Sequence, residues 1–197
     1  MITPSHIIYN WAIAKKLENT HGADSHRWYG LLIGGFLPDT PTYALFFVHT
    51  LVLGTSQREL WDTIYFDSAW TPVITLSHSF VFWPLIIALG YAFGQRLLFW
   101  IGMGSLFHSA LDFFVHVNDA YRHFWPLSDW KFMSPISYWN PAYYGNIVGS
   151  VDTVVVFLLL YYLITHTKRR WVQKVIIANA VLYLAATILP FFIFGGL

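Results

Sequence analysis

Long apolar segments recur along this chain, and they restrict the fold more than any other feature of the sequence. Four of them are long enough to cross a hydrocarbon core of roughly 30 Å as helices rising about 1.5 Å per residue. They run over residues 71–93, 97–117, 147–165 and 175–194. Charged residues make up only 11% of the 197 residues, whereas soluble domains have about 25%. Lipid offers no water to the backbone, so such a chain folds as a helical bundle.

Two further segments complete the predicted bundle. Residues 29–53 are long enough to span but contain Pro38-Asp39-Thr40-Pro41. Prolines interrupt a regular helix, and such breaks are tolerated in membranes where they line a protein-walled cavity. Residues 3–17 begin with the helix-start pair Thr3-Pro4 but are too short to span. We therefore expect one all-α membrane domain over residues 1–197, with about five transmembrane helices, one broken at Pro38–Pro41, and a short interfacial or re-entrant N-terminal helix.

The charged residues predict a topology and exclude some functions. Eight of the 11 Lys and Arg fall on one side, which the positive-inside rule makes cytoplasmic; they are residues 15, 16, 27, 96, 168–170 and 174. The loops at 54–70 and 118–145 then face outward. A net charge of +1 provides no basic field for nucleic acid. The chain has no Cys, so any metal must be held by His, Asp or Glu.

Ionisable residues in apolar settings are the candidates for chemistry, because charges at membrane depth are costly and usually face a partner, a cavity or an ion. Five positions fit this description: His6, Asp39, His78, His108 and Asp112. Each alone is more often a hydrogen-bonded interior His or a helix cap than a ligand. Imidazole and carboxylate groups that converge in one bundle suit a borderline divalent ion such as zinc.

His108, Asp112 and His116 repeat every four residues and therefore share one helical face. His108 and Asp112 are separated by roughly 6 Å of helical rise and can chelate one ion together. His116 lies roughly 12 Å of rise from His108, too far for both to bind one zinc with donors at about 2 Å. We expect His116 to serve a second ion, to support the ligands or to act as a catalytic base. A His at the membrane interface is the non-functional alternative.

The loop that follows holds further candidates. Asp119, Arg122 and His123 lie near the start of the loop at 118–145, whose many aromatic residues argue against disorder. Arg122 and Lys131 could clamp an anionic group such as phosphate, or equally could anchor to lipid head groups. Asp152, in the span at 147–165, is a candidate ligand or orienting carboxylate.

Over roughly residues 1–150, these residues resemble the bacterial inner-membrane metal-dependent hydrolases of the YdjM type. The segments that carry the resemblance are Thr3-Pro4-Ser5-His6, Leu37-Pro38-Asp39, His78-Ser79, His108-x3-Asp112-x3-His116, Asp119-Ala-Tyr-Arg122-His123-Phe-Trp-Pro and Ser134-Pro-Ile-Ser-Tyr-Trp-Asn-Pro141. The family is distantly similar to zinc-dependent phospholipase C. The resemblance implies a bacterial inner-membrane protein whose metal ligands are His6, Asp39, His78, His108 and Asp112.

The chain departs from the family pattern at several positions where His or Asp is common. These positions are Tyr121, Asn140, Tyr143 and Tyr144. Because they are potential ligands, the differences bear on whether a second metal ion binds.

We expect a metal-dependent membrane hydrolase that acts on a phosphoester or similar bond of a lipid or lipid-linked substrate. Zinc would lower the pKa of a bound water and polarise the scissile group. His116, Asp119 and His123 would serve in catalysis, with His116 or Asp119 as general base or acid, and Arg122 would hold the anionic group.

Two other classes remain open. One is a non-catalytic membrane protein whose His/Asp cluster binds metal or stabilises the bundle, together with a membrane-protein partner or a second copy of the chain. The other is a small cation or proton transporter, although the internal repeat typical of such folds is not found in the sequence. The charge pattern also creates a conflict: His6 falls near the cytoplasmic side and the loop at 119–130 outside. If His6 and Asp112 share an ion, the first helix must re-enter the membrane or the topology must be inverted.

Overall fold

The computed structural model describes the backbone of residues 1–193 and the side chains of residues 1–185 and 187. Helix accounts for 71% of the chain, and no strand forms among the described residues. The elements are α1 (Thr3–His21), α2 (Ser25–Phe36), η1 (Leu37–Asp39), α3 (Thr40–Phe47), η2 (Val48–Val52), α4 (Gln57–Glu59), η3 (Leu60–Ile64), α5 (Thr71–Ser77), α6 (Phe82–Ala92), α7 (Arg96–Phe113), η4 (Pro141–Tyr143), α8 (Gly145–Thr165) and α9 (Arg170–Ile193). Phe194, the last residue of the expected span at 175–194, lies outside the described residues.

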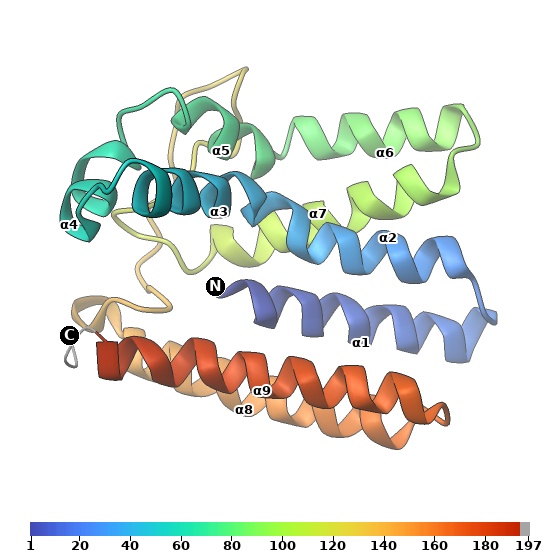
Figure 1. Cartoon of the computed structure of the whole chain (residues 1–197). Helices are drawn as coiled ribbons and strands as arrows, with labels where there is room; N and C mark the ends of the chain where they lie inside the picture. Colours follow the sequence, from blue (N-terminus) through green and yellow to red (C-terminus); the bar gives the residue numbers. More distant parts are fainter. Residues whose placement is uncertain (194–197) are drawn as a thin grey trace.

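Helix α1 lies in the middle of the bundle, between α2 and α7 on one side and the α8–α9 hairpin on the other (Figure 1). Ile8, Trp11 and residues of α8 and α9 form one apolar cluster. The helix is longer than the expected 3–17, and an interfacial position does not fit its contacts on both sides. Its apolar residues are covered by the protein itself, which is why a helix that is not among the candidate membrane spans can still bury residues on both sides.

Glycines bring the backbones of α1, α2 and α7 unusually close together. A Cβ on Gly34 would lie 2.7 Å from the backbone nitrogen of Ser105, and a Cβ on Gly35 would lie 3.0 Å from the carbonyl oxygen of His6. Any larger residue at Gly34 would push α2 away from α7. This close approach places residues of all three helices within reach of one another in the centre of the bundle.

The break expected at Pro38–Pro41 does not interrupt the helical path. Pro38 and Pro41 lie in the first turns of η1 and α3, where a missing backbone N–H costs little. The segment Ser25–Val52 therefore forms one continuous apolar helical segment of 28 residues.

The sharper break falls within the expected span at 71–93, where α5 and α6 are bent by 53°. The Ser79 hydroxyl accepts hydrogen bonds from the backbone N–H groups of Val81 and Phe82, and Phe80 N–H donates to His123 O. These bonds satisfy the backbone groups that the bend leaves free. The bend places His78 next to the other metal-ligand candidates.

Among the residues that the structure describes, two helices are long and apolar enough to cross a membrane, Ser25–Val52 and Gly145–Thr165, and the bent pair α5–α6 makes a third if it counts as one span. The expected five spans are therefore not confirmed.

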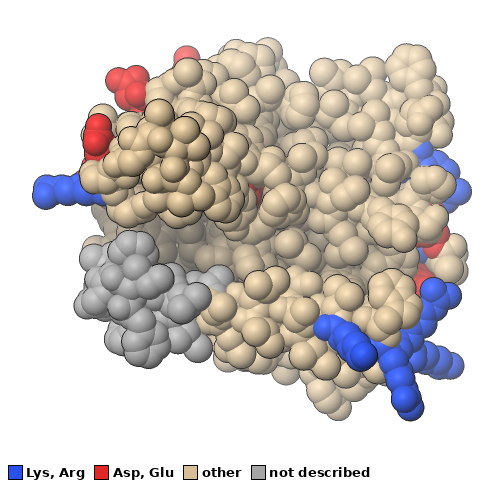
Figure 2. Space-filling model, viewed as in Figure 1, with Lys and Arg blue, Asp and Glu red and all other residues tan. Residues whose placement is uncertain are grey.

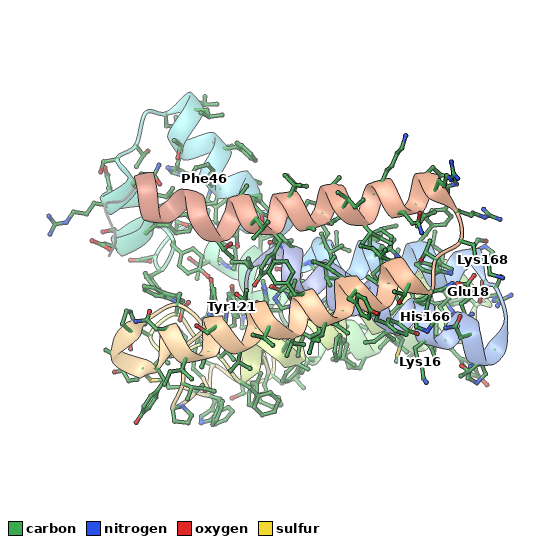
Figure 3. All side chains as sticks on the ribbon, turned by 90° about the horizontal axis from the view of Figure 1, so that it is seen from below. Lys16, Glu18, Phe46, Tyr121, His166 and Lys168 are labelled. Carbon is green, nitrogen blue, oxygen red and sulfur yellow. The ribbon has the colours of Figure 1, made fainter. Side chains whose placement is uncertain are left out.

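The α1–α2, α6–α7 and α8–α9 connections lie at one end of the bundle (Figure 1). On the face shown in Figure 2, most Lys and Arg gather at that end. Lys16 and Lys168 lie there, and Tyr121 lies toward the other end (Figure 3).

The direction of α1 resolves the conflict between charge and site. His6 precedes Lys16 by ten residues, roughly 15 Å along the helix. Helix α1 therefore carries His6 into the bundle while Lys16 stays at the basic end. The two residues need not lie at the same depth, so an inverted topology is not required.

Candidate metal centre

Four buried or half-buried side chains converge where η1, α5 and α7 meet. They are Asp39, His78, His108 and Asp112, and one ligand atom of each lies within 4.8 Å of the others. Asp39 ends η1, His78 follows the last residue of α5, and His108 and Asp112 are one turn apart on α7. A buried Asp/His/His/Asp group of this kind could hold a metal ion.

The two histidines of this group are oriented alike. Nδ1 of His78 lies 2.9 Å from Ile74 O, and Nδ1 of His108 lies 3.0 Å from Gly35 O, so each Nδ1–H donates to a backbone carbonyl. Each Nε2 is buried and has no hydrogen-bond partner. Metal-binding histidines are typically held in this way, with the second nitrogen aimed at the ion.

Both free nitrogens point at carboxylates. Nε2 of His108 lies 3.2 Å from Asp112 Oδ2 and 3.5 Å from Asp39 Oδ1. Nε2 of His78 lies 3.6 Å from each of these oxygens. An imidazole lone pair that faces a carboxylate is repelled unless a proton or a metal ion lies between them.

The second oxygen of Asp112 faces another pair of histidines. Asp112 Oδ1 lies 3.0 Å from His6 Nε2 and 3.4 Å from His116 Nε2. The amino group of Met1 also contacts this carboxylate oxygen. The His6 ring stacks on His108 with centroids 3.5 Å apart. Asp112 thus faces four histidines: His6 and His116 through Oδ1, and His78 and His108 through Oδ2.

Thr3 and Tyr43 hold Asp39 from behind. The Thr3 hydroxyl donates to Asp39 Oδ2, and the Tyr43 hydroxyl donates to Thr3 Oγ1 at 2.8 Å. Oδ1 of Asp39 is left to face His78 and His108. Thr3 was expected only as a helix-start residue, but Ile2 is the N-cap and the Thr3 side chain makes no capping bond. Nothing local in the sequence shows that Thr3 reaches Asp39, 36 positions away.

Asp152 does not join this group. Its carboxylate accepts hydrogen bonds from Ser5 at 2.7 Å, Tyr9 at 3.0 Å and Tyr183 at 3.3 Å. With three hydroxyl donors the carboxylate is satisfied without an ion. Its position fits the orienting role considered for it, because it fixes Ser5, the neighbour of His6.

His116 lies beyond the end of α7 at Phe113 and contacts the centre through Asp112, with Nε2 3.4 Å from Asp112 Oδ1. The 12 Å of helical rise expected between His108 and His116 therefore does not apply. His116 Nδ1 lies 2.7 Å from Asp119 Oδ2, which also accepts from Trp139 Nε1 at 3.2 Å. Burial opposes ionisation of Asp119, but the His116 and Trp139 hydrogen bonds outweigh it and lower its pKa below the usual value.

The other two loop candidates lie further out. Arg122 Nη1 pairs with Asp129 Oδ1 at 2.9 Å. His123 is buried beside Phe80 and Phe113, and its Nδ1 lies 3.1 Å from Tyr121 O. Burial, reinforced by the nearby His78, lowers the pKa of His123 to about 4. The structure thus brings His6 and His116 into contact with Asp112, whereas Arg122 pairs with Asp129 and His123 hydrogen-bonds to Tyr121.

Tyr121 is the aromatic neighbour that the sequence pattern did not single out as a site residue. Its ring stacks on His78 with centroids 3.9 Å apart, and its hydroxyl accepts from Tyr65 OH at 3.2 Å. The YdjM-type pattern often has a His at this position, which could bind a metal ion. This chain instead has a tyrosine whose ring covers His78. The tyrosine at position 121, where a histidine is common in the YdjM-type pattern, was the signal in the sequence that could have identified this residue.

Comparison of the chain with protein-family models, with curated proteins and with solved structures gives no match. The resemblance to YdjM-type hydrolases is therefore neither supported nor refuted by these comparisons. What the site can do must be argued from its geometry.

Proposed function

We propose that this protein is a zinc-dependent membrane hydrolase that cleaves a phosphoester or similar bond of a lipid or lipid-linked substrate. The observation that carries the proposal is the pair of buried, unpartnered Nε2 atoms of His78 and His108 facing two carboxylates. Four donors of nitrogen and oxygen type match the usual zinc ligands.

Protonation of the rings is the alternative to a metal ion, and the packing argues against it. A proton on His108 alone would satisfy its own Nε2 but would leave Nε2 of His78 facing the same two carboxylates. If His6 were also charged to pair with Asp112, two buried cations would lie in contact. One divalent ion removes the repulsion between lone pairs and carboxylates and leaves the stacked rings neutral.

The residues around the centre suit hydrolysis. A bound zinc ion lowers the pKa of a coordinated water and polarises the scissile group. Asp119 accepts from His116 Nδ1–H and so fixes the ring with Nε2 as the acceptor directed toward Asp112. His116 can therefore take a proton within the site as a general base. Tyr121 covers His78 and excludes water from that side.

Elemental analysis of protein purified in mild detergent tests the proposal. We expect at least one zinc per chain, and we expect His108→Ala and Asp112→Ala to remove both the zinc and the turnover of a phosphoester substrate. His166→Ala is the matched control, because His166 is exposed at the basic end (Figure 3). Stoichiometric metal in both site variants would overturn the assignment. Two ions per wild-type chain would instead assign His116 to ligation.

A bacterial inner-membrane location with about five spans is the second part of the proposal. Its support is a mean hydropathy of +0.51 together with the two or three helices apolar enough to span. Reporter fusions in the α1–α2, α6–α7 and α8–α9 connections should all report the cytoplasm. Extraction of the protein by alkaline carbonate would contradict an integral location.

A non-catalytic metal site is the second candidate, and the burial of the centre favours it. His78, His108 and Asp112 are at most 1% exposed, as in metal sites that only stabilise a fold. In that case His108→Ala lowers the melting temperature of the protein, and no turnover is found with the metal-loaded wild type.

A further inference from the structure

A cavity of about 350 Å³ adjoins the metal centre on its loop side. Its wall is formed by residues 65–75, which lead into and include part of α5, and by residues 119–122 and 131 of the long loop. Three wall residues contact histidines of the centre: Ile74 O accepts from His78, Tyr121 stacks on His78, and Asp119 binds His116. The cavity and the centre are therefore separated only by the residues that hold the histidines.

Two cations line this cavity, Arg122 and Lys131. The carboxylates on its wall are Asp119, which is engaged by His116 and Trp139, and Asp67, which is exposed. The two cations and the two carboxylates of the wall carry no net charge together. An anion is therefore attracted by direct contact with Arg122 and Lys131 rather than by a long-range field.

Arg122 is already paired, but weakly held. Its partner Asp129 is 80% exposed and does not line the cavity. Exposed ion pairs contribute only about 0–1 kcal/mol. A phosphate group in the cavity can replace this carboxylate at little cost and offers the planar guanidinium two oxygens at once.

We propose that this cavity binds the phosphate-bearing polar group of the substrate through Arg122 and Lys131, and that Asp129 occupies Arg122 until the phosphate displaces it. The inference rests on the proposed function for the chemistry that follows, but phosphate binding itself does not require the metal. The volume fits a small polar group and lies at the lower end of the usual range for ligand sites, roughly 300–1,000 Å³.

Binding of inorganic phosphate to chelator-treated, metal-free protein in detergent tests the inference. We expect Arg122→Gln to weaken phosphate binding about tenfold or more, Lys131→Gln to weaken it several-fold, and Asp129→Asn to strengthen it several-fold. Arg58→Gln is the matched control, because Arg58 also forms an exposed pair, with Asp62, outside this cavity. Unchanged phosphate affinity in both Arg122→Gln and Lys131→Gln would overturn the proposal. The exposed Lys131 keeps the test valid if Arg122→Gln does not fold.

Competition separates the two sources of the phosphate group. Displacement of inorganic phosphate by nanodiscs with phosphatidic acid, but not with phosphatidylcholine alone, supports a lipid head group. Displacement by glycerol phosphate supports a soluble ester. Failure of both competitors contradicts the proposal.

The outcome is independent of the metal hypothesis. His108→Ala should abolish zinc binding and leave phosphate binding in the metal-free protein unchanged. Phosphate bound normally by a protein that never binds zinc would refute the proposed function and keep the cavity assignment.

Discussion

Two carboxylate environments in this bundle, a buried one at Asp112 and a partly buried one at Asp152, differ in what surrounds them. Asp152, between α1, α8 and α9, accepts hydrogen bonds from three hydroxyl groups. Asp112, on α7, faces imidazole nitrogens on both its oxygens, and two of the neighbouring Nε2 atoms have no hydrogen-bond partner. The first carboxylate is satisfied by hydroxyl donors, whereas the second contacts the Met1 amino group through Oδ1 and faces two unpartnered imidazole nitrogens through Oδ2, where a metal ion could bind. A buried carboxylate in an apolar protein is thus not by itself evidence of a metal site; the nature of its donors decides.

The largest expected effect separates these two carboxylates directly. Asp112→Asn should lower zinc affinity at least 100-fold, because it removes the negative charge of a proposed ligand that lies against His108 and His116. Asp152→Asn should leave the zinc content unchanged. Zinc titration of both variants against a competing chelator measures the difference. Equal loss of zinc in the two variants would remove the distinction between the environments.

A second expectation concerns the hydroxyl that holds Asp39. Thr3→Val keeps the shape but removes the hydrogen bond to Oδ2, and zinc affinity should fall about 10–100-fold. In cobalt-substituted protein the ligand-field absorption bands should shift, which a purely structural role of Thr3 would not cause. Thr3→Ser should restore both. Thr20→Val is the control, because that hydroxyl bonds only near the exposed end of α1.

A third expectation concerns the role of Asp152 in stability. Asp152→Leu leaves the hydroxyls of Ser5, Tyr9 and Tyr183 without their acceptor and should cost about 1–3 kcal/mol of unfolding free energy. Thermal unfolding in detergent, with zinc content measured in parallel, tests this. An unchanged melting temperature would show that the three hydrogen bonds do not hold the hairpin to α1.

The smallest expected effect is a pH dependence from His123. Burial lowers the pKa of His123 to about 4 in the folded protein, below the value of about 6.5 for a solvent-exposed histidine, so the unfolded chain binds more protons between these limits. Stability is fully present above about pH 6.5 and is lost as the pH falls toward 4, with about 1 kcal/mol lost at pH 6. His123→Phe should reduce this slope in unfolding curves. The same slope in wild type and variant would place the titrating group elsewhere.

Several features of the fold and the site followed from short stretches of sequence. Apolar periodicity predicted the helices, and the four-residue spacing correctly placed His108 and Asp112 together. The convergence of Asp39 and His78 on this pair was proposed from their apolar settings, and the structure brings them within ligand distance of one another. These features depend on local backbone preference and on the cost of charge in lipid, which a single sequence reveals.

Other features depend on contacts between distant segments. The bend after His78 is stabilised by the loop that carries His123, and α7 ends at Phe113, before His116. The order of residues along a helix cannot show where tertiary packing ends that helix. The distance expected from helical rise therefore does not describe His116, although the four residues that could hold one ion include His108 and not His116, as the sequence predicted.

Sequence alone was sufficient for the helical class, the lack of cysteine and four residues that could hold a metal ion, Asp39, His78, His108 and Asp112, because these depend on composition and on local spacing. Only the tertiary structure distinguished Asp112 from Asp152, since both are carboxylates in apolar helices. Hydroxyls from α1 and α9 surround one of them, and imidazoles from α1, α5 and α7 and from the turn after α7 surround the other. Hydrogen-bond satisfaction is a property of the assembled bundle, and it distinguishes the carboxylate that could hold an ion from the one that hydroxyl groups already satisfy.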